Sequence, residues 1–491
     1  MSVRNHLSPK SPQPAPTSNQ RAPVATPVKS GIVTVKAAAK PDALNDLGVV
    51  VTPSFTKARP ISTTGDIEFR VEAHQFDDGL WGAEFLYVSR ADSIPLFGNP
   101  LNTEAARFQT LTEAAGDAYT RGLRSIKDQK HRTAKTKQWA AKLEALVQWI
   151  DDAMVEVRDA DAELLGHGLT GIDIFTGMGN LALGLASMGV KFELCCEIDP
   201  TASEVAKRNL RPRLMHDDIR TLLATCKAKG IKLKADVVTT GLLCQAFSPA
   251  GLGLGFKDPK LQAAYEASMQ VLEAVDAKVI IVECAAEFLK NAGGKDADEF
   301  IRRMMLRNYR AQHRVLNAAC FGVPQMRERS ILVFTRMDLD VNPITGYLFP
   351  EEHEPTATVD DILDHDLPAT IPEADITDLK PVPVGRFTKR VKVGHIRGKK
   401  HQGYRVYASN GVGPTLTASG GGAARFSEAY KVAGGARALT PREACRMQGL
   451  PEWAHHHPVH SHAMRHAGNA VAVPMARELF RQLGAILGNR S

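Results

Sequence analysis

The sequence GIDIFTGMGN, at residues 171–180, determines how the larger part of this chain is built. Its apolar beginning is typical of a buried strand, and the glycines that follow allow a tight turn into a helix over residues 181–188. Glu197 lies twenty positions after Gly177, at the end of the next strand-like run, where an acid can bind ribose hydroxyls. Taken alone, the stretch fits a nucleoside-containing cofactor and a turn that serves only packing equally well.

Short apolar runs continue on the C-terminal side of this stretch. They cover residues 172–175, 192–196, 237–240 and 279–282, and each is followed by a helical or glycine-rich segment. This alternation predicts an α/β fold with a doubly wound, mostly parallel sheet. In such a sheet, ligands bind beyond the carboxyl ends of the strands.

Three further segments place reactive side chains at strand ends. The loop GLLCQAFSPAG at residues 241–251 follows a strand directly and presents Cys244, although a buried free cysteine is the commoner situation in proteins. Glu283 closes the run 279–282. Arg327 and Arg329 alternate just before the run 330–334, where a solvated charge pair is the alternative.

In order and spacing, these segments resemble the C5-cytosine methyltransferase family over about residues 171–487. The resemblance implies a Rossmann-like class I methyltransferase fold, with S-adenosylmethionine as cofactor and double-stranded DNA as partner. It also implies a cytosine that is flipped out of the duplex, because a stacked base is closed to attack. Residues 437–451 and 468–471 resemble the ninth and tenth motifs of the family.

The same resemblance assigns roles to individual residues. Cys244 is expected to attack cytosine C6, Glu283 to hold the N3 and amino edge, and Arg327 and Arg329 to position the base and its 2-oxo group. The implied cofactor-binding residues are Asp173, Phe175, Gly177, Gly179, Glu197, Ile198, Asp218, Ile219, Leu243 and Asn469.

Five residues, at four places in the chain, depart from the family pattern. Leu243 replaces the proline before the nucleophile, and Cys284-Ala285 replaces an Asn-Val pair whose amide should brace the cysteine loop. Ile198 replaces an aromatic residue that stacks on the cofactor, and Asn180 replaces a glycine. Since all four catalytic residues remain, we expect an active enzyme. The alternatives are an RNA cytosine-5 methyltransferase and a catalytically impaired DNA-binding relative.

A basic region without any acid, residues 384–404, predicts contact with DNA phosphates. The stretches around Gln402 and Thr415 resemble the target-recognition domain of the family. Together with two residues of the cysteine loop, the predicted DNA-binding residues are Gln245, Ser248, Arg397, Lys399, Lys400, Gln402, Arg405, Thr415 and Leu416.

The remaining composition sets the domain plan. Residues 1–45 are predicted to be a disordered basic tail, and 46–165 an accessory α+β module that aids DNA engagement. Residues 166–336 are predicted to form the catalytic domain, 337–436 the smaller target-recognition domain, and 437–491 the part that completes the catalytic domain. Within the module, residues 67–71 and 82–88 predict a hairpin, and 110–122 a helix.

Bulk properties exclude several other classes of protein. Of the 491 residues 44% are apolar and 23% charged, and no run approaches the roughly 18 apolar residues that span a membrane. Seven cysteines without a CxxC pair argue against a disulfide framework and a zinc site. Six histidines between residues 455 and 466 lack partners at ligand spacing, so no metal is expected. We expect a cytoplasmic, nucleoid-associated monomer of bacterial or phage origin.

Overall fold

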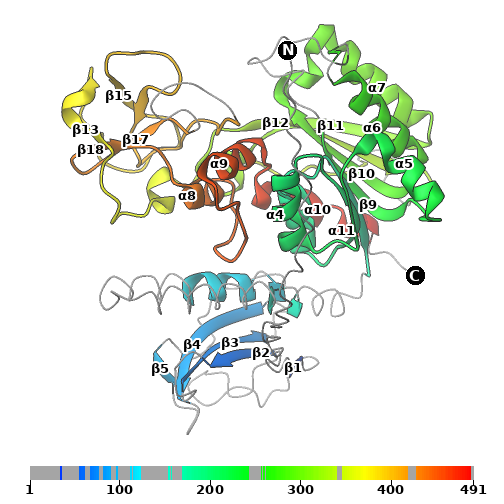
Figure 1. Ribbon diagram of the computed structural model, residues 1–491, viewed down its shortest axis with the longest axis horizontal. Helices are drawn as coiled ribbons and strands as arrows, with labels where there is room; N and C mark the ends of the chain where they lie inside the picture. Colours follow the sequence, from blue (N-terminus) through cyan, green and yellow to red (C-terminus); the bar gives the residue numbers. More distant parts are fainter. Residues whose placement is uncertain are drawn as a thin grey trace, which may run out of the picture.

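The computed structural model describes three β-sheets and the helices around them (Figure 1). Most of the chain from residue 168 onward is covered, and shorter pieces before it. The described residues are 34–35, 55–60, 67–76, 81–89, 95–97, 111–112, 114–122, 153–154, 156–157, 168–242, 256, 258–259, 261–339, 346–418 and 427–487.

The largest sheet has seven strands in the order β11-β12-β10-β9-β6-β7-β8. Strand β12 runs in the direction opposite to that of the other six strands. The chain moves outward from β6 through β7 to β8 and then returns to β9 on the other side of β6, so the strand order reverses between β6 and β9. This confirms the predicted doubly wound sheet and places a ligand-binding crevice at the reversal. The strands are β6 (Thr170–Ile174), β7 (Lys191–Cys196), β8 (Leu214–His216), β9 (Lys234–Gly241), β10 (Asp276–Ala285), β11 (Tyr309–Asn317) and β12 (Glu328–Arg336).

Two hydrophobic cores lie on the two faces of this sheet because successive strand residues point to opposite faces. Ile280 and Val282 pack into the core beneath α5, α6 and α7, whereas Val279 and Ile281 face the core that includes α3, α4 and α10. The helices are α3 (Asn180–Ala186), α4 (Pro200–Leu210), α5 (Ile219–Ala228), α6 (Gln262–Ala274), α7 (Lys295–Met305), α10 (Val473–Arg481) and α11 (Gly484–Leu487); the short 3-10 turns are η4 (Ala286–Leu289), η5 (Asn291–Gly294) and η6 (Ala318–Phe321).

The C-terminal segment returns to the first helix of the large sheet. Gly184 of α3 allows this approach, since a Cβ there would lie 2.6 Å from the Ala476 side chain and 2.9 Å from the Val473 carbonyl of α10. Asn180 adds a hydrogen bond from its side-chain amide to the Val471 carbonyl at 3.0 Å. The helices α8 (Pro441–Arg446) and α9 (His460–Asn469) precede α10.

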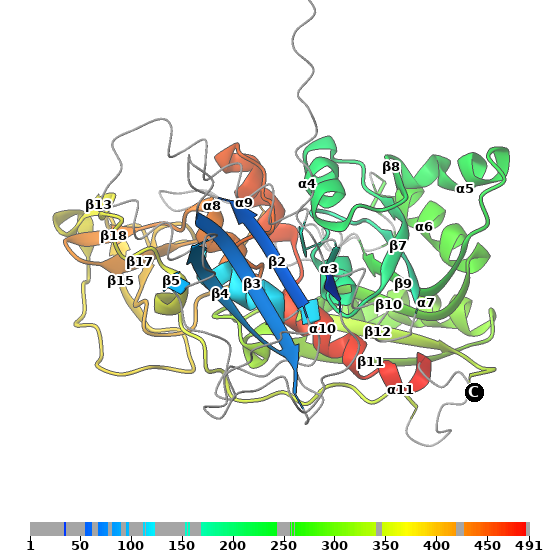
Figure 2. The ribbon, with the colours of Figure 1, turned by 90° about the horizontal axis from the view of Figure 1, so that it is seen from below.

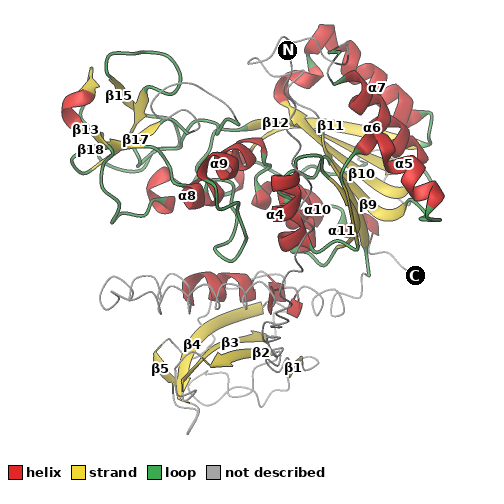
Figure 3. Cartoon of the chain, in the orientation of Figure 1, coloured by secondary structure: helices red, strands yellow, loops and turns green. Residues whose placement is uncertain are grey.

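A second sheet of six short strands lies at one end of the molecule, where loops predominate (Figure 3). Its order is β13-β18-β17-β16-β15-β14, and it has its own core around Val393, Val406 and Ala436. This sheet falls within the range predicted for target recognition. Its elements are η7 (Val359–Ile362), β13 (Ile371–Pro372), η8 (Glu373–Asp375), β14 (Ile376–Thr377), β15 (Lys392–Ile396), β16 (Arg405–Tyr407), β17 (Ala429–Val432) and β18 (Gly435–Arg437).

The N-terminal residues form a five-stranded antiparallel meander, β1 (Thr34–Val35), β2 (Phe55–Pro60), β3 (Ile67–Gln75), β4 (Trp81–Ser89) and β5 (Pro95–Phe97). The predicted hairpin is β3–β4, and residues 111–112 and 114–122 are helical as predicted. In Figures 1 and 2 this helix lies between the meander and the rest of the chain. A Cβ on its Gly116 would be 3.4 Å from the Trp453 indole nitrogen. Apart from β1, the expected tail lies outside the described residues.

No helix in the described part of the chain is long and apolar enough to cross a membrane.

Candidate active site

The turn after β6 is built for close approach to a ligand. Phe175, Gly177 and Gly179 all have positive φ angles, of 55°, 58° and 93°, so the backbone folds back sharply before α3 begins. The N–H of Gly177 donates to the Glu197 carboxylate at 2.7 Å, and the N–H of Asp199 donates to its other oxygen at 2.8 Å. These two bonds fix the Glu197 side chain at the end of β7, beside the turn.

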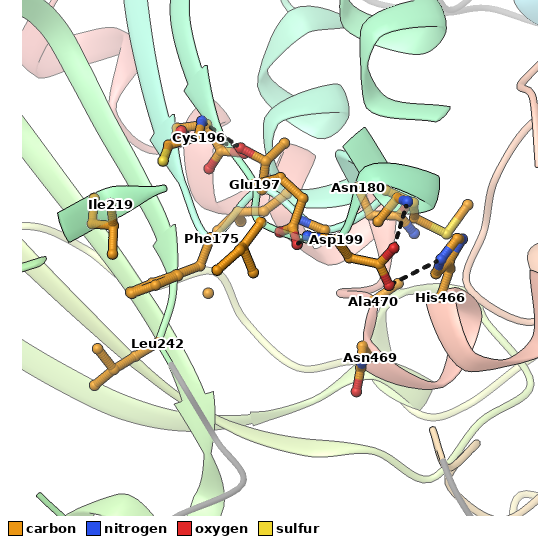
Figure 4. A pocket seen from close by; sticks show the side chains of 18 of the residues that line it. Phe175, Asn180, Cys196, Glu197, Asp199, Ile219, Leu242, His466, Asn469 and Ala470 are labelled. Atoms are coloured by element: carbon orange, nitrogen blue, oxygen red, sulfur yellow. Dashed lines mark hydrogen bonds and ion pairs between the residues drawn. The ribbon is translucent and has the colours of Figure 1, made fainter. Parts of the chain in front are cut away.

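A cavity of about 570 Å³ opens at this edge of the sheet, a size typical of small-molecule sites. Figure 4 shows Ile219 and Leu242 on one side of it, with Asn469, Ala470 and His466 on the other. Eight of the ten predicted cofactor-binding residues line it, namely Asp173, Phe175, Gly177, Glu197, Ile198, Asp218, Ile219 and Asn469.

The other two predicted cofactor-binding residues are placed differently. Gly179 is not among the lining residues; a Cβ there would lie 2.9 Å from the Leu210 side chain, so this glycine permits the turn to pack on α4. Packing on α4 therefore requires a glycine here, and the cofactor contact of Gly179 stays a prediction. Leu243 lies outside the described residues.

Acidic groups dominate the electrostatics of the cavity. Burial raises the pKa of Asp173 to about 7, against the hydrogen bond that it accepts from the Thr239 hydroxyl at 2.6 Å. Burial also raises the pKa of Glu197 in spite of its two backbone donors. Asp218 at the start of α5 is paired with Arg220, which lowers its pKa. The lining thus suits a ligand that carries positive charge and hydroxyl groups.

Glu283 and Arg329 form an ion pair at the edge of the same cavity. Arg329 Nε lies 2.8 Å from Glu283 Oε1, and the two side chains are only 14% and 7% exposed. The backbone N–H of Leu242 donates to the Glu283 carbonyl at 2.8 Å, so the chain enters the predicted cysteine loop directly beside this pair. Cys244, Gln245 and Ser248 lie outside the described residues.

Arg327 does not have the position that base contact requires. It is 2% exposed, and its two terminal nitrogens donate to the Leu416 carbonyl at 3.1 Å and the Gly468 carbonyl at 3.0 Å. The guanidinium is therefore held between two chain segments and does not line the cavity. Sequence spacing could not separate it from Arg329, because both arginines lie on the same side of an extended chain.

The predicted DNA-binding residues divide into exposed and buried ones. Arg397, Lys400 and Gln402 are exposed, and Lys399 is exposed with its ammonium 4.9 Å from the Tyr404 ring centre. Arg405 lies 3.7 Å from Glu428. The prediction is wrong for Leu416, which is 2% exposed and packs in the core with Tyr430 and Met447. The half-buried Thr415 donates its hydroxyl to the Met326 carbonyl.

Sequence reasoning missed a cluster around the start of α4. Asp199 caps this helix, and Arg465 binds it at 2.7 Å. His466 Nε2 lies 3.0 Å from the Thr201 hydroxyl, and burial lowers the pKa of His466 to about 4 although Asp199 opposes this. The Asp-Pro pair at residues 199–200 is a helix-start signal that would have pointed to it. The described residues hold no group of three or more side chains arranged to bind a metal ion.

The chain is similar to known proteins of one family. Residues 169–485 match the family model of the C-5 cytosine-specific DNA methylases. The type II methyltransferase M.HhaI of Haemophilus parahaemolyticus is 31% identical over 340 residues, which cover 68% of this chain and 98% of that protein. M.Bsp6I of Bacillus sp. is 28% identical over 314 residues, or 62% and 95%. The crystal structure of the S. pombe Dnmt2 methyltransferase aligns with a TM-score of 0.47 and 16% identity, covering 65% of this chain and 98% of that one. The family model and the identity with M.HhaI show that the chain belongs to the C-5 cytosine-specific DNA methylase family.

Proposed function

We propose that this DNA cytosine-5 methyltransferase uses Cys244 as its nucleophile and S-adenosylmethionine, bound in the cavity, as its methyl donor. The observation that supports this most is the Glu283–Arg329 pair. It lies at the cavity edge, beside the backbone that enters the Cys244 loop. Nucleophile, base-holding acid and cofactor pocket would thus meet at one edge of the sheet.

The cavity residues suit S-adenosylmethionine on chemical grounds. Asp173 Oδ2 is buried and accepts no hydrogen bond from the described side chains and backbone, and most of the charged residues that line the cavity are acidic. A cationic sulfonium and an ammonium group complement such a lining. Glu197 would hold the ribose hydroxyls, and Asp218 and Ile219 would lie at the adenine end. Bound there, the cofactor supplies the methyl group.

The protein's own residues would do the rest of the chemistry. Attack of the Cys244 thiolate on C6 of the cytosine pushes electrons to C5, which makes C5 a nucleophile. Glu283, kept in place by Arg329, would hold the N3 and amino edge and stabilise the charge that develops on the ring. After methylation, loss of the C5 proton and expulsion of the thiolate restore the aromatic ring.

DNA would reach this edge through the basic surface of the second sheet. Arg397, Lys399 and Lys400 are exposed there, as phosphate contacts require. We propose that the enzyme acts as a monomer on double-stranded DNA in the cytoplasm of a bacterium or a phage-infected cell.

The test is transfer of labelled methyl from S-adenosylmethionine to mixed-sequence duplex DNA, followed by bisulfite mapping. We expect label on cytosine C5 within a short sequence, and its loss in Cys244→Ser. Glu283→Gln should slow transfer by roughly 10²-fold or more, since a donor or acceptor aimed at developing charge has effects of that size. Glu299→Gln, on the exposed face of α7, is the matched control and should transfer at the wild-type rate. Undiminished transfer by Cys244→Ser would refute the assignment of the nucleophile.

A further inference from the structure

A segment from the region of the second sheet is hydrogen-bonded to the residues just before β12, the strand that carries Arg329. Residues 413–416, which we call the anchor segment, run beside residues 324–327. The N–H of Gly413 donates to the Pro324 carbonyl at 2.8 Å, and the N–H of Met326 donates back to the Gly413 carbonyl at 2.9 Å. Residues 324–327 continue directly into β12 and Arg329, so the anchor segment is hydrogen-bonded to the chain that leads to Arg329.

Buried side chains complete this attachment. Gln325 Oε1 accepts the N–H of Leu416 at 2.8 Å, while Arg327 donates to the carbonyl of the same residue at 3.1 Å. Both polar backbone groups of Leu416 are therefore held by side chains that are at most 2% exposed. Losing either bond would leave a buried polar group unpaired, so the position of the anchor segment depends on both side chains.

The second terminal nitrogen of Arg327 reaches the cofactor cavity's wall. It donates to the carbonyl of Gly468, and the next residue, Asn469, lines the cavity. Gly468 also touches the chain just after the anchor segment, since a Cβ there would lie 2.3 Å from the Thr417 carbonyl carbon. One planar guanidinium therefore joins the anchor segment to the cavity wall with two bonds of fixed relative direction.

We propose that Arg327 is a positioning residue that couples cofactor binding to DNA binding in this enzyme. The inference rests on the proposed function, because it assumes the cofactor in the cavity and DNA on the second sheet. Cofactor contact with Asn469 fixes Gly468 and, through Arg327, fixes the anchor segment that leads into the DNA-binding region. By linkage, DNA that orders the anchor segment tightens cofactor binding by the same factor.

The experiment is a thermodynamic cycle on the full chain. Anisotropy of a fluorescein-labelled duplex that carries the mapped cytosine site gives the Kd for DNA with and without saturating S-adenosylhomocysteine. Isothermal titration gives the Kd for S-adenosylhomocysteine with and without that duplex. We expect a wild-type coupling factor of about 5–150, equal in both directions. In Arg327→Lys, whose ammonium lacks the two-pronged geometry, the factor should fall to about 1–2, with each separate Kd changed far less.

Arg336→Lys is the matched control. It is the same substitution at the far end of β12, the strand that follows Arg327, and there Arg336 pairs with Asp276 and Asp338. It should keep the wild-type coupling factor. Thr415→Val removes only the hydroxyl bond to the Met326 carbonyl, and it tests the anchor segment independently if Arg327→Lys fails to fold. Its coupling factor should be reduced several-fold.

The outcomes separate the two proposals. Wild-type protein that binds neither ligand, or binds without methylating, contradicts the proposed function itself. Wild-type protein that methylates but shows a coupling factor near 1 overturns only the role of Arg327. The role of Arg327 is also overturned if folded Arg327→Lys keeps the wild-type coupling factor. If Arg327→Lys does not fold, a wild-type coupling factor in Thr415→Val overturns it. A purely structural Arg327 would lower the melting temperature and leave the ratio of the two Kd values unchanged.

Discussion

The buried carboxyl of Asp173 makes a prediction about stability and pH. Asp173 is 1% exposed, and burial raises its pKa from 3.8 to about 7. An acid with a raised pKa holds its proton in the folded state over a pH range in which the unfolded chain has already released it. The folded state is therefore favoured at low pH, and this contribution is lost as the pH rises from about 4 to about 7.

The magnitude follows from the size of the shift. Roughly 3 pKa units at 1.36 kcal/mol per unit correspond to a destabilisation of about 4 kcal/mol above pH 7, and relaxation around the charge reduces this figure. Asp173→Asn keeps the shape and the acceptor for the Thr239 hydroxyl but cannot ionise. The variant should therefore be more stable than the wild type by about 2–4 kcal/mol at pH 8, and the advantage should shrink to below about 1 kcal/mol at pH 4.5.

Urea unfolding of the cofactor-free protein at pH 4.5, 6, 7 and 8 measures this difference. Asp236→Asn is the matched control with opposite sign. Asp236 binds Lys278 at 2.7 Å, and its pKa is lowered although burial opposes this, so its stabilisation is fully present above about pH 4. That variant should be less stable than the wild type by a constant amount from pH 4.5 to pH 8. A stability difference between Asp173→Asn and wild type that does not change with pH would refute the reasoning.

Three further substitutions test separate parts of the molecule. Ile198→Phe places a ring where a 64% exposed aliphatic side chain now lines the cavity. Stacking worth about 0.5–1.5 kcal/mol should lower the Kd for S-adenosylhomocysteine roughly two- to ten-fold. An unchanged calorimetric Kd would argue against stacking at this position. Gly468→Ala puts a methyl group 2.3–2.5 Å from the backbone of Thr417 and Ala418. The free energy of unfolding, measured by thermal denaturation, should therefore fall by about 1–3 kcal/mol or more. Wild-type stability would mean that the two segments can separate freely. Lys399→Gln should weaken DNA binding and lower the slope of log K against log salt by about 0.9; an unaltered slope would exclude a phosphate contact.

The sequence predicted the large sheet well because its signals are local. Each strand is a short apolar run with a turn or a helix behind it, and the order of such units leaves few possible topologies. Seven of the eight expected cofactor residues that line the cavity do so for the same reason, since they lie at or just after the ends of β6, β7 and β8, whereas Asn469 lies at the end of α9. The short strands of the second sheet carry no comparable pattern, and there the sequence showed only composition.

The errors in the site come from residues whose neighbours are distant in sequence. Arg327 and Arg329 alternate on one chain, but Arg329 meets Glu283 of β10, while Arg327 meets residues 416 and 468. Leu416 has the apolar side chain of a core residue, and only its place beside Thr415 suggested DNA. Gly179, which the resemblance assigned to the cofactor, has a φ of 93° and lies tightly against Leu210, so packing also requires a glycine there. In each case tertiary contacts, which no spacing encodes, determine the role.

The cofactor cavity is built from both ends of the catalytic region, and this explains why the anchor segment matters. Asn180 and Gly184 of α3 hold the residues around Val471 and α10, so the first turn and the last helices form one wall. The region of the second sheet, which we propose binds DNA, is inserted between them in the sequence. It can report cofactor binding only where it touches that wall. Among the described residues, one such contact runs through Gly468 and Arg327, and Leu416 and Tyr430 also pack in one core with Met464 and Ala467 of α9. Methyl transfer requires cofactor and DNA to be bound at the same time. A buried side chain that is hydrogen-bonded both to the anchor segment and to the cavity wall can therefore couple the binding of the two ligands.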